Sequence, residues 1–326
     1  MFARSLIRAV SVLAVAFFAV GLAQAADDYP KRPVTILVGY SAGGPTDIAA
    51  RVMAKYMGDK LGQTFVVENV TGASGAIAAR KAVNAKPDGY TILMGNSGNL
   101  SVLPYLIKNL GYDPLTQLDP IGLVVNFKCV LAVPVDSPFK NVQDLVVYAK
   151  ENPGKLTYAS DGVGSLNHIS TEWFKLIAGI GIAHVPYRGN APAIHDLVAG
   201  RVDMSFLSMA AAAPHLQANK LRLLGVATPK PLEELPGVPT IMSQGVPNLV
   251  SEPWNAFLTP KGVSPEIRNK LNKIMNEALQ DKEVLASLSG IGLYPMGGTT
   301  QDLENYMKSQ SALWSDVIKR ANIEQQ

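Results

Sequence analysis

The sequence has very little cysteine: Cys129 is the only one in 326 residues. A single cysteine excludes an internal disulfide, so the fold must depend on its apolar core. Cys129 lies in an apolar run typical of a strand, and we interpret it as a small buried hydrophobe rather than a reactive thiol.

Signatures of the common enzyme classes are also missing. No Walker lysine follows Gly43 and Gly44, and Asn167 stands where a dinucleotide fingerprint needs its third glycine. The four histidines show no metal-ligand spacing; they are His168, His184, His195 and His215. The sequence therefore predicts neither an enzyme nor a bound metal or cofactor.

The chain lacks an excess of charge of either sign. Residues 1–25 contain Arg4 and Arg8 but no acid, so the remainder holds 27 basic and 26 acidic residues. The charges are mixed along the chain without a basic stripe, which argues against nucleic acid as a partner.

The N-terminus has the pattern of a cleavable signal peptide. Arg4 and Arg8 precede an apolar run over 9–22, and Ala23-Gln24-Ala25 forms a small-x-small cleavage site. The run is short for a membrane span. We expect residues 1–25 to be removed and the mature protein to be exported.

The rest of the chain alternates between strand-like and helix-like segments. This pattern predicts an α/β fold with mostly parallel sheets, and the apolar stretch over 121–133 is long enough to pass from one lobe to another. We expect two lobes, the second inserted into the first. Lobe 1 would comprise residues 26–124 and 228–326, and lobe 2 residues 125–227.

A glycine-rich turn follows the first expected strand, 34–38. It contains Gly43 and Gly44, and the next residue, Pro45, suits the first position of a helix. Strand, glycine turn and helix start together aim free backbone N–H groups at an anion. The turn holds no cation, so the backbone would bind that anion.

Similar turns follow other strands. One contains Asn96 and Ser97, and a second strand–turn–helix unit over 160–165 lies in the expected lobe 2. Two glycine turns that face each other across a cleft would hold a carboxylate from both sides. Asp47 and Asp203 could form a proton-transfer pair, but their positions favour local capping and hydrogen bonding in the cleft.

Several motifs in a fixed order resemble the extracytoplasmic solute-binding proteins of tripartite tricarboxylate transporters, the Bug family. The resemblance covers the chain from Tyr29 to the last helix. Its motifs are Tyr29-Pro30-x-x-Pro33, the run from Ile36 to Asp47, Glu68-Asn69 with Gly72 and Gly75, Pro87-Asp88-Gly89-Tyr90, Tyr158 to Ser165 with His168, Pro186-Tyr187-Arg188-Gly189, Asp196-Leu197-x-x-Gly200-x-Val202-Asp203, and Val238-Pro239-Thr240.

The resemblance implies a two-lobe, venus-flytrap fold of the type II periplasmic binding class. It also implies a periplasmic protein that binds a small organic carboxylate, a di- or tricarboxylate or an aromatic acid, and delivers it to membrane permease subunits. Delivery by closure of the lobes needs only a monomer, which is the state we expect. The ligand-binding residues expected are Tyr40, Ser41, Ala42, Gly43, Gly44, Thr46, Asp47, Asn96, Ser97, Ser160, Gly162, Val163, Gly164, Ser165, His168, Arg188 and Asp203.

The sequence departs from the family pattern at two places and leaves some side-chain roles open. Ala42 stands where the family often has a proline, and Asn69-Val70-Thr71 replaces a more usual Arg-Pro continuation. Arg188 would pair with a second carboxylate or remain solvated. Phe127 and Trp254 would form an apolar wall or belong to the core.

Two other functions remain as alternatives to transport. A ligand-sensing protein would present the same bound acid to a receptor kinase. An exported enzyme would use Asp47, His168 or Cys129, but no catalytic triad or metal constellation supports it.

Overall fold

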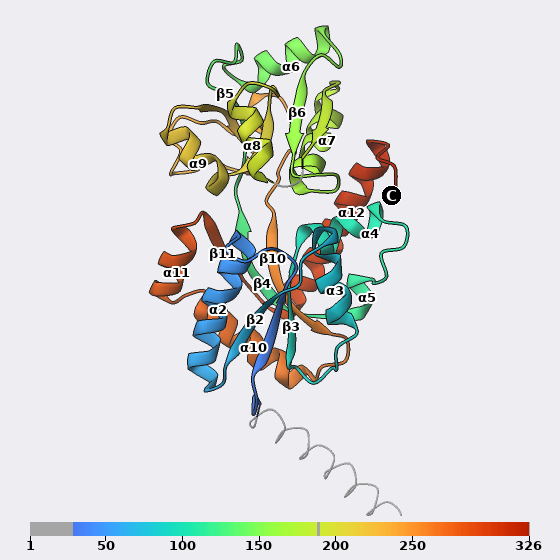
Figure 1. Ribbon diagram of the computed structural model, residues 1–326, viewed down its shortest axis with the longest axis vertical. Helices are drawn as coiled ribbons and strands as arrows, with labels where there is room; N and C mark the ends of the chain where they lie inside the picture. The colour runs from blue at the N-terminus through green and yellow to red at the C-terminus, as the bar shows by residue number, and fades with distance from the viewer. Residues whose placement is uncertain (1–28, 188–189, 326) are drawn as a thin grey trace, which may run out of the picture.

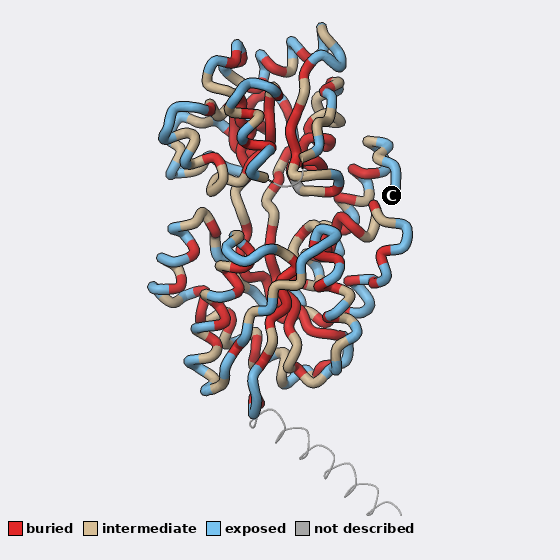
Figure 2. Tube along the Cα trace, viewed as in Figure 1, coloured by how far each residue is buried: buried red, intermediate tan, exposed pale blue. Residues whose placement is uncertain are grey.

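The computed structural model describes residues 29–187 and 190–325, which form two lobes stacked along the long axis of the molecule (Figure 1). Buried residues concentrate along the central strands of each lobe, and exposed residues on the outer helices and loops (Figure 2). Two chain segments run side by side between the lobes: the Phe127 amide donates to the Pro253 carbonyl at 2.7 Å. Among the described residues, no helix has both the length and the apolar character needed to cross a bilayer.

The lower lobe is built on a six-stranded sheet with the order β11-β4-β10-β3-β1-β2. Its strands are β1 (Val34–Val38), β2 (Phe65–Asn69), β3 (Thr91–Asn96), β4 (Leu118–Phe127), β10 (Trp254–Pro260) and β11 (Leu293–Gly297). Strand β1 pairs in parallel with β2 and β3, whereas β10 and β11 pair antiparallel with their neighbours. The predicted mostly parallel sheet is therefore wrong for this half, because the returning chain inserts β10 between β3 and β4.

Helices cover both faces of this sheet, and the first strand shows why. Ile36 and Val38 pack in one core cluster with Met53 of α2, whereas Leu37 packs in another with Ala79 of α3. Successive side chains of a strand point to opposite faces, so β1 carries apolar residues on both faces, with Thr35 as its one polar residue. The helical elements of this half of the chain are α2 (Pro45–Leu61), η1 (Ala73–Gly75), α3 (Ala76–Val83), η2 (Gly98–Val102), α4 (Leu103–Leu106), α5 (Pro114–Gln117), α10 (Pro265–Ala278), α11 (Lys282–Ser289) and α12 (Thr300–Arg320).

The upper lobe has two small sheets joined by a bridge. The order β8-β5-β9 forms one sheet and β6-β7 the other, and Tyr158 of β6 bridges to Met204 just before β8. The elements are β5 (Cys129–Pro134), α6 (Val142–Glu151), β6 (Thr157–Ser160), α7 (Leu166–Ala178), β7 (Ala183–Pro186), α8 (Asn190–Val198), β8 (Ser205–Ser208), α9 (Met209–Gln217), β9 (Leu221–Val226) and η3 (Met242–Gln244).

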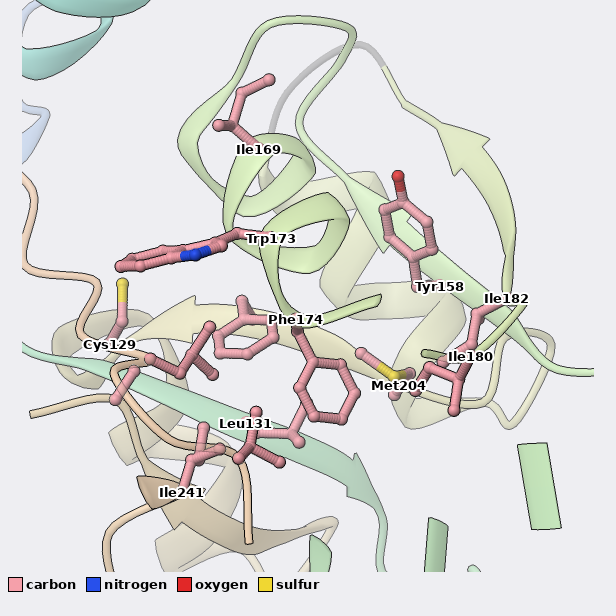
Figure 3. Close-up of a cluster of buried hydrophobic side chains, with 14 of the residues drawn as sticks. Cys129, Leu131, Tyr158, Ile169, Trp173, Phe174, Ile180, Ile182, Met204 and Ile241 are labelled. Carbon is pink, nitrogen blue, oxygen red and sulfur yellow. The ribbon is translucent and has the colours of Figure 1, made fainter. Parts of the chain in front are cut away.

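The core of the upper lobe includes residues from the proline-rich connector. Ile241 lies in one apolar cluster with Leu131 of β5 and Phe174 of α7 (Figure 3). The Ser251 amide donates to the Ala227 carbonyl at 2.9 Å. The division of the chain at 227 was an expectation, and we propose from this packing that lobe 2 continues to about residue 252.

The last helix joins the two lobes. Trp314 of α12 packs edge-on against Trp173 of α7, with ring centroids 5.5 Å apart. Val317 and Ile318 belong to the same apolar cluster as the core of the upper lobe. The C-terminal part of α12 therefore packs against lobe 2, although the helix starts beside the sheet of lobe 1 (Figure 1).

Candidate functional site

A cavity of about 490 Å³ lies between the two lobes. The residues that line it are Tyr40, Ser41, Gly44, Pro45, Thr46, Ser74, Asn96, Ser97, Gly98, Phe127, Cys129, Asp161, Gly164, Ser165, Asn167, Asn190, Phe206, Leu207, Ser208, Pro253 and Trp254. Both glycine turns contribute to it, together with the two segments that connect the lobes.

The lower wall is formed where β1, β2 and β3 end. The Tyr40 hydroxyl donates to the Ser74 carbonyl at 3.0 Å, which ties the turn after β1 to the turn after β2. Asn96 and Asn99 exchange backbone-to-side-chain hydrogen bonds of 2.9 and 3.0 Å, which shape the turn after β3. The carboxyl ends of neighbouring parallel strands therefore meet at one edge, as the sequence predicted.

Helix α2 directs its N-terminus at this wall. Its N-cap, Gly44, has an extended backbone and makes no side-chain capping bond, and Pro45 occupies the first turn. The first amides of a helix lack partners within the helix, and the helix dipole adds positive charge there. The amides of Thr46 and Asp47 are thus placed in the first turn of an uncapped helix whose start lines the cavity.

Asp47 serves the turn rather than the cavity. Its buried carboxylate accepts hydrogen bonds from the Gly43 amide at 2.9 Å, Arg51 Nε at 2.9 Å and Asn69 Nδ2 at 2.8 Å. Burial by itself raises the pKa of Asp47, but the bonds from Arg51, Gly43 and Asn69 outweigh it and hold the pKa below its ordinary value. Asp47 is therefore a charged anchor that fixes the shape of residues 40–47.

Three amides of the second glycine turn, residues 160–165, are already engaged. The Gly164 amide donates to His168 Nδ1 at 3.1 Å, the Ser165 amide to the Gly162 carbonyl at 3.1 Å, and the Gly162 amide to Ser160 Oγ at 3.2 Å. The Ser165 hydroxyl caps α7. This turn therefore offers fewer free donors than its sequence suggested.

A stack of rings supports the second turn from behind. His168 and His184 lie parallel with centroids 4.3 Å apart, and Ser160 Oγ is 2.6 Å from His184 Nε2. Burial, reinforced by the neighbouring His184, lowers the pKa of His168 to about 4. Neutral His168 can thus accept the Gly164 hydrogen bond at physiological pH.

Asp161 is the acidic side chain of the cavity wall. Its Oδ1 accepts a hydrogen bond from Asn167 Nδ2 at 3.0 Å. Burial raises the pKa of Asp161 to about 6, while hydrogen bonds from Asn167 and Asn190 act in the opposite direction. At neutral pH this carboxylate is ionised and belongs to the site itself.

The connecting segments supply an apolar wall. Phe127, Pro253 and Trp254 line it beside Cys129. Burial raises the pKa of the Cys129 thiol to about 12, so this cysteine is a packed thiol rather than a nucleophile. Trp254 is fully buried, and its Nε1 has no hydrogen-bond partner among the described residues.

The structure brings part of the predicted site together. Of the residues predicted from the sequence, those that line the cavity are Tyr40, Ser41, Gly44, Thr46, Asn96, Ser97, Gly164 and Ser165. Those placed away from its walls are Ala42, Gly43, Asp47, Ser160, Gly162, Val163, His168 and Asp203. Arg188 lies outside the described residues. Contact with a ligand stays a prediction for every one of them.

Several of the residues away from the cavity have structural partners instead. Asp203 accepts hydrogen bonds from the Thr157 amide at 2.7 Å and the Thr157 hydroxyl at 2.8 Å, so it fixes the start of β6. Ser160 and His168 hold the second turn, as described above. Val163 points outward and is 40% exposed.

Several lining residues were not predicted from the sequence. Asp161 lies inside the second turn, between Ser160 and Gly162, and lines the cavity. Asn167, Asn190 and Ser208 stand in the first turns or at the caps of α7, α8 and α9. The start of a helix directly after a strand is the sequence signal that indicates these positions. Among the described residues, no cluster of His, Cys, Asp or Glu is arranged to hold a metal ion.

Comparison with known proteins points to one family. The "Tripartite tricarboxylate transporter family receptor" profile matches residues 49–323. Protein BugT from Bordetella pertussis is 33% identical over 315 residues, covering 96% of this chain and 97% of BugT.

Solved structures agree. The R. palustris protein Rpa4515, solved with adipate, has a TM-score of 0.83 and 35% identity, covering 92% of this chain and 100% of that one. The periplasmic binding protein BugD has a TM-score of 0.79 and 33% identity, covering 91% of this chain and 100% of BugD.

Proposed function

Because the chain belongs to the tripartite tricarboxylate transporter family of receptors, we propose that it captures a small organic carboxylate in the cavity between its lobes and delivers it to the permease subunits of such a transporter. The family is one of periplasmic, non-enzymatic solute receptors with a two-lobe α/β fold.

One observation carries the proposal: the uncapped N-terminus of α2 opens onto the cavity next to three strand ends. Hydroxyl groups of Ser41, Thr46 and Ser97 stand around it. Backbone amides and hydroxyls in a partly closed site bind a carboxylate without a cationic side chain. The relative Rpa4515 was solved with adipate, a dicarboxylate.

The two-lobe arrangement supports transport by closure. The lobes are joined by paired segments at Phe127 and Pro253, and hinges of this kind allow lobes to close on a ligand. We propose that the protein is exported and that its signal peptide is cleaved after residue 25. The mature monomer then closes on its ligand in the periplasm and opens at the permease. The residues of this signal sequence lie outside the described part of the chain.

The proposal is tested first by calorimetry against mono-, di- and tricarboxylates and aromatic acids. We expect heat of binding and a thermal shift with at least one of them. The variant Ser41→Glu places a negative charge at the lower wall and is expected to weaken binding at least about tenfold, which corresponds to about 1.4 kcal/mol.

Thr71→Glu is the matched control, because it introduces the same charge at an exposed position after β2 that does not line the cavity. It is expected to bind within about threefold of the wild type. No binding of any acid by the wild type, or equal effects of the two glutamates, would refute the proposed site.

Transport and sensing are separated by reconstitution. Uptake of the identified acid into proteoliposomes that contain the permease subunits is expected to depend on this receptor. If the receptor binds the acid but never stimulates uptake, the transport role is refuted and a sensing role is favoured.

A further inference from the structure

The two sides of the cavity offer opposite hydrogen-bonding groups. The lower side presents the donors of the α2 N-terminus. Among the lining residues that the structure describes, Asp161 on the upper side is the only one with a formally charged side chain. A cavity that bound carboxylates alone would gain nothing from an acid at this place.

The neighbours of Asp161 do not cancel its acceptor character. Asn167 uses its Nδ2 to donate to Asp161 Oδ1 at 3.0 Å. The Asn190 side chain also stabilises the charged form of Asp161 and so lowers its pKa, and the Asn190 Oδ1 is buried with no partner among the described residues. The upper side therefore presents the Asp161 carboxylate and, beside it, a free amide oxygen.

Three backbone amides of the second glycine turn are not free to offset these acceptors. The amides of Gly162, Gly164 and Ser165 each donate to an acceptor within the lobe. A second carboxylate placed here would lie against an ionised acid, and these three amides would not be free to compensate its charge. An ammonium group would meet two acceptors instead, and buried acceptors without a donor are costly.

On the basis of the proposed function, we propose that the ligand is a zwitterion: an amino-substituted carboxylic acid whose carboxylate binds the N-terminus of α2 and whose ammonium group binds Asp161 and Asn190. The apolar wall of Phe127, Phe206 and Trp254 lies in the same cavity and suits the carbon skeleton between the two charged ends. Asp161 is thus the residue that determines specificity for the amino group.

Matched ligand pairs test this directly. Calorimetry at pH 7.5 compares succinate with aspartate, glutarate with glutamate, adipate with 2-aminoadipate, and benzoate with 4-aminomethylbenzoate. For the pair whose skeleton fits, we expect the amino acid to bind about 10- to 100-fold more tightly, the range of a hydrogen bond to a charged group.

The variant Asp161→Asn keeps the shape of the side chain and removes its charge. It is expected to lose most of the preference for the amino member of the pair and to bind the unsubstituted acid as well as or better than the wild type. Asp136→Asn makes the same charge change at an exposed position of the upper lobe and is expected to keep the preference. Circular dichroism and the melting temperature check that both variants are folded.

The outcomes separate this inference from the proposed function. If unsubstituted acids bind the wild type as tightly as their amino partners, or if Asp161→Asn keeps the preference, the zwitterion inference is refuted while carboxylate binding stands. If neither member of any pair binds, the proposed function fails. Small molecules released from the purified wild-type protein on denaturation, identified by mass spectrometry, give an independent check: an amine-free acid would overturn the inference.

Discussion

The two glycine turns look alike in sequence and differ in chemistry. Residues 40–47 and residues 160–165 each connect a strand to a helix, and each contains a glycine with positive φ, +80° at Gly43 and +77° at Gly164. The helix after the first turn has no side-chain cap. The helix after the second is capped by Ser165, and His168 accepts the Gly164 amide. The helix start after the first turn keeps amides free for a ligand, whereas side chains of the second turn and its helix accept hydrogen bonds from amides there.

The aspartates of the two turns differ in the same sense. Asp47 faces three donors, and its pKa lies below the ordinary value; Asp161 lies in the cavity wall, and its pKa is raised to about 6. The carboxylate of Asp47 is used by the hydrogen bonds of the first turn, whereas the carboxylate of Asp161 is available to a ligand in the cavity. A shared strand–glycine–helix pattern therefore does not define what a turn binds.

The largest expected effect concerns acid stability, and it separates the two titrating groups of the second turn. His168 has a pKa of about 4, below its ordinary 6.5, so lowering the pH from 6.5 to 4 protonates the unfolded chain first and destabilises the fold. Asp161 has a pKa of about 6, above its ordinary 3.8, so lowering the pH from 6 to 3.8 stabilises the fold. The two effects oppose each other in the wild type.

Replacing one of the two titrating groups reveals the effect of the other on the pH dependence of stability. Asp161→Asn is expected to lose up to about 3 kcal/mol of unfolding free energy between pH 6.5 and 4, at about 1.4 kcal/mol per unit of pKa shift. His184, whose pKa is also lowered, adds to this loss. In His168→Asn the effect of Asp161 remains, so its unfolding free energy is expected to stay level or to rise as the pH falls. Urea unfolding across this pH range measures both, and identical pH profiles for the two variants would contradict the comparison.

The next effect concerns the anchor of the first turn. Asp47→Ala removes the acceptor of three hydrogen bonds and leaves their donors without it, so we expect a loss of about 2–3 kcal/mol in unfolding free energy and weaker ligand binding. Asp59→Ala is the control, because Asp59 pairs with Lys55 on an exposed face of the same helix, and it is expected to cost under about 0.5 kcal/mol. Equal losses in chemical denaturation would show that the first turn does not depend on Asp47.

The smallest effect compares the two glycines themselves. An alanine at Gly43 would find open space and pay only for the left-handed backbone, about 1 kcal/mol. An alanine at Gly164 would also place its Cβ 3.1 Å from Leu106 Cδ1 of the lower lobe, so we expect about 2 kcal/mol. Melting temperatures of the two variants check the order, and a larger drop for Gly43→Ala would reverse it.

Local pattern was sufficient to predict the elements that local sequence specifies. The apolar run 34–38, the glycine turn and the Pro45 helix start correspond to β1 and α2 within a residue, because apolar strands and helix caps depend on neighbours in the chain. The interruption of the apolar stretch at Lys128 likewise marks the passage from β4 to β5.

Pairing over long distances could not be read in the same way. Strand β10 was not predicted, and its place between β3 and β4 depends on partners about 130 to 160 residues away. The same holds for Ile241, which enters the core of the upper lobe from a proline-rich connector. Nothing in the local pattern indicates which lobe such a segment joins.

The candidate site shows the same difference between what local sequence specifies and what tertiary packing specifies. The turns could be located from the sequence, but not which of their groups remain free. That depends on His168 reaching back to Gly164, on Asp203 bonding to Thr157, and on Asn190 approaching Asp161 from another helix. Each of these contacts is set by tertiary packing rather than by spacing.

The positions of the tryptophans give the molecule its own optical reporter. The chain has three: Trp254 in the wall of the cavity, and Trp173 with Trp314 at the junction of α7 and α12. All of the indole emission therefore originates either where a ligand arrives or where the lobes meet. Quenching and spectral shifts of unlabelled protein should record both occupancy and closure, and a Trp254→Phe variant would leave the junction signal alone.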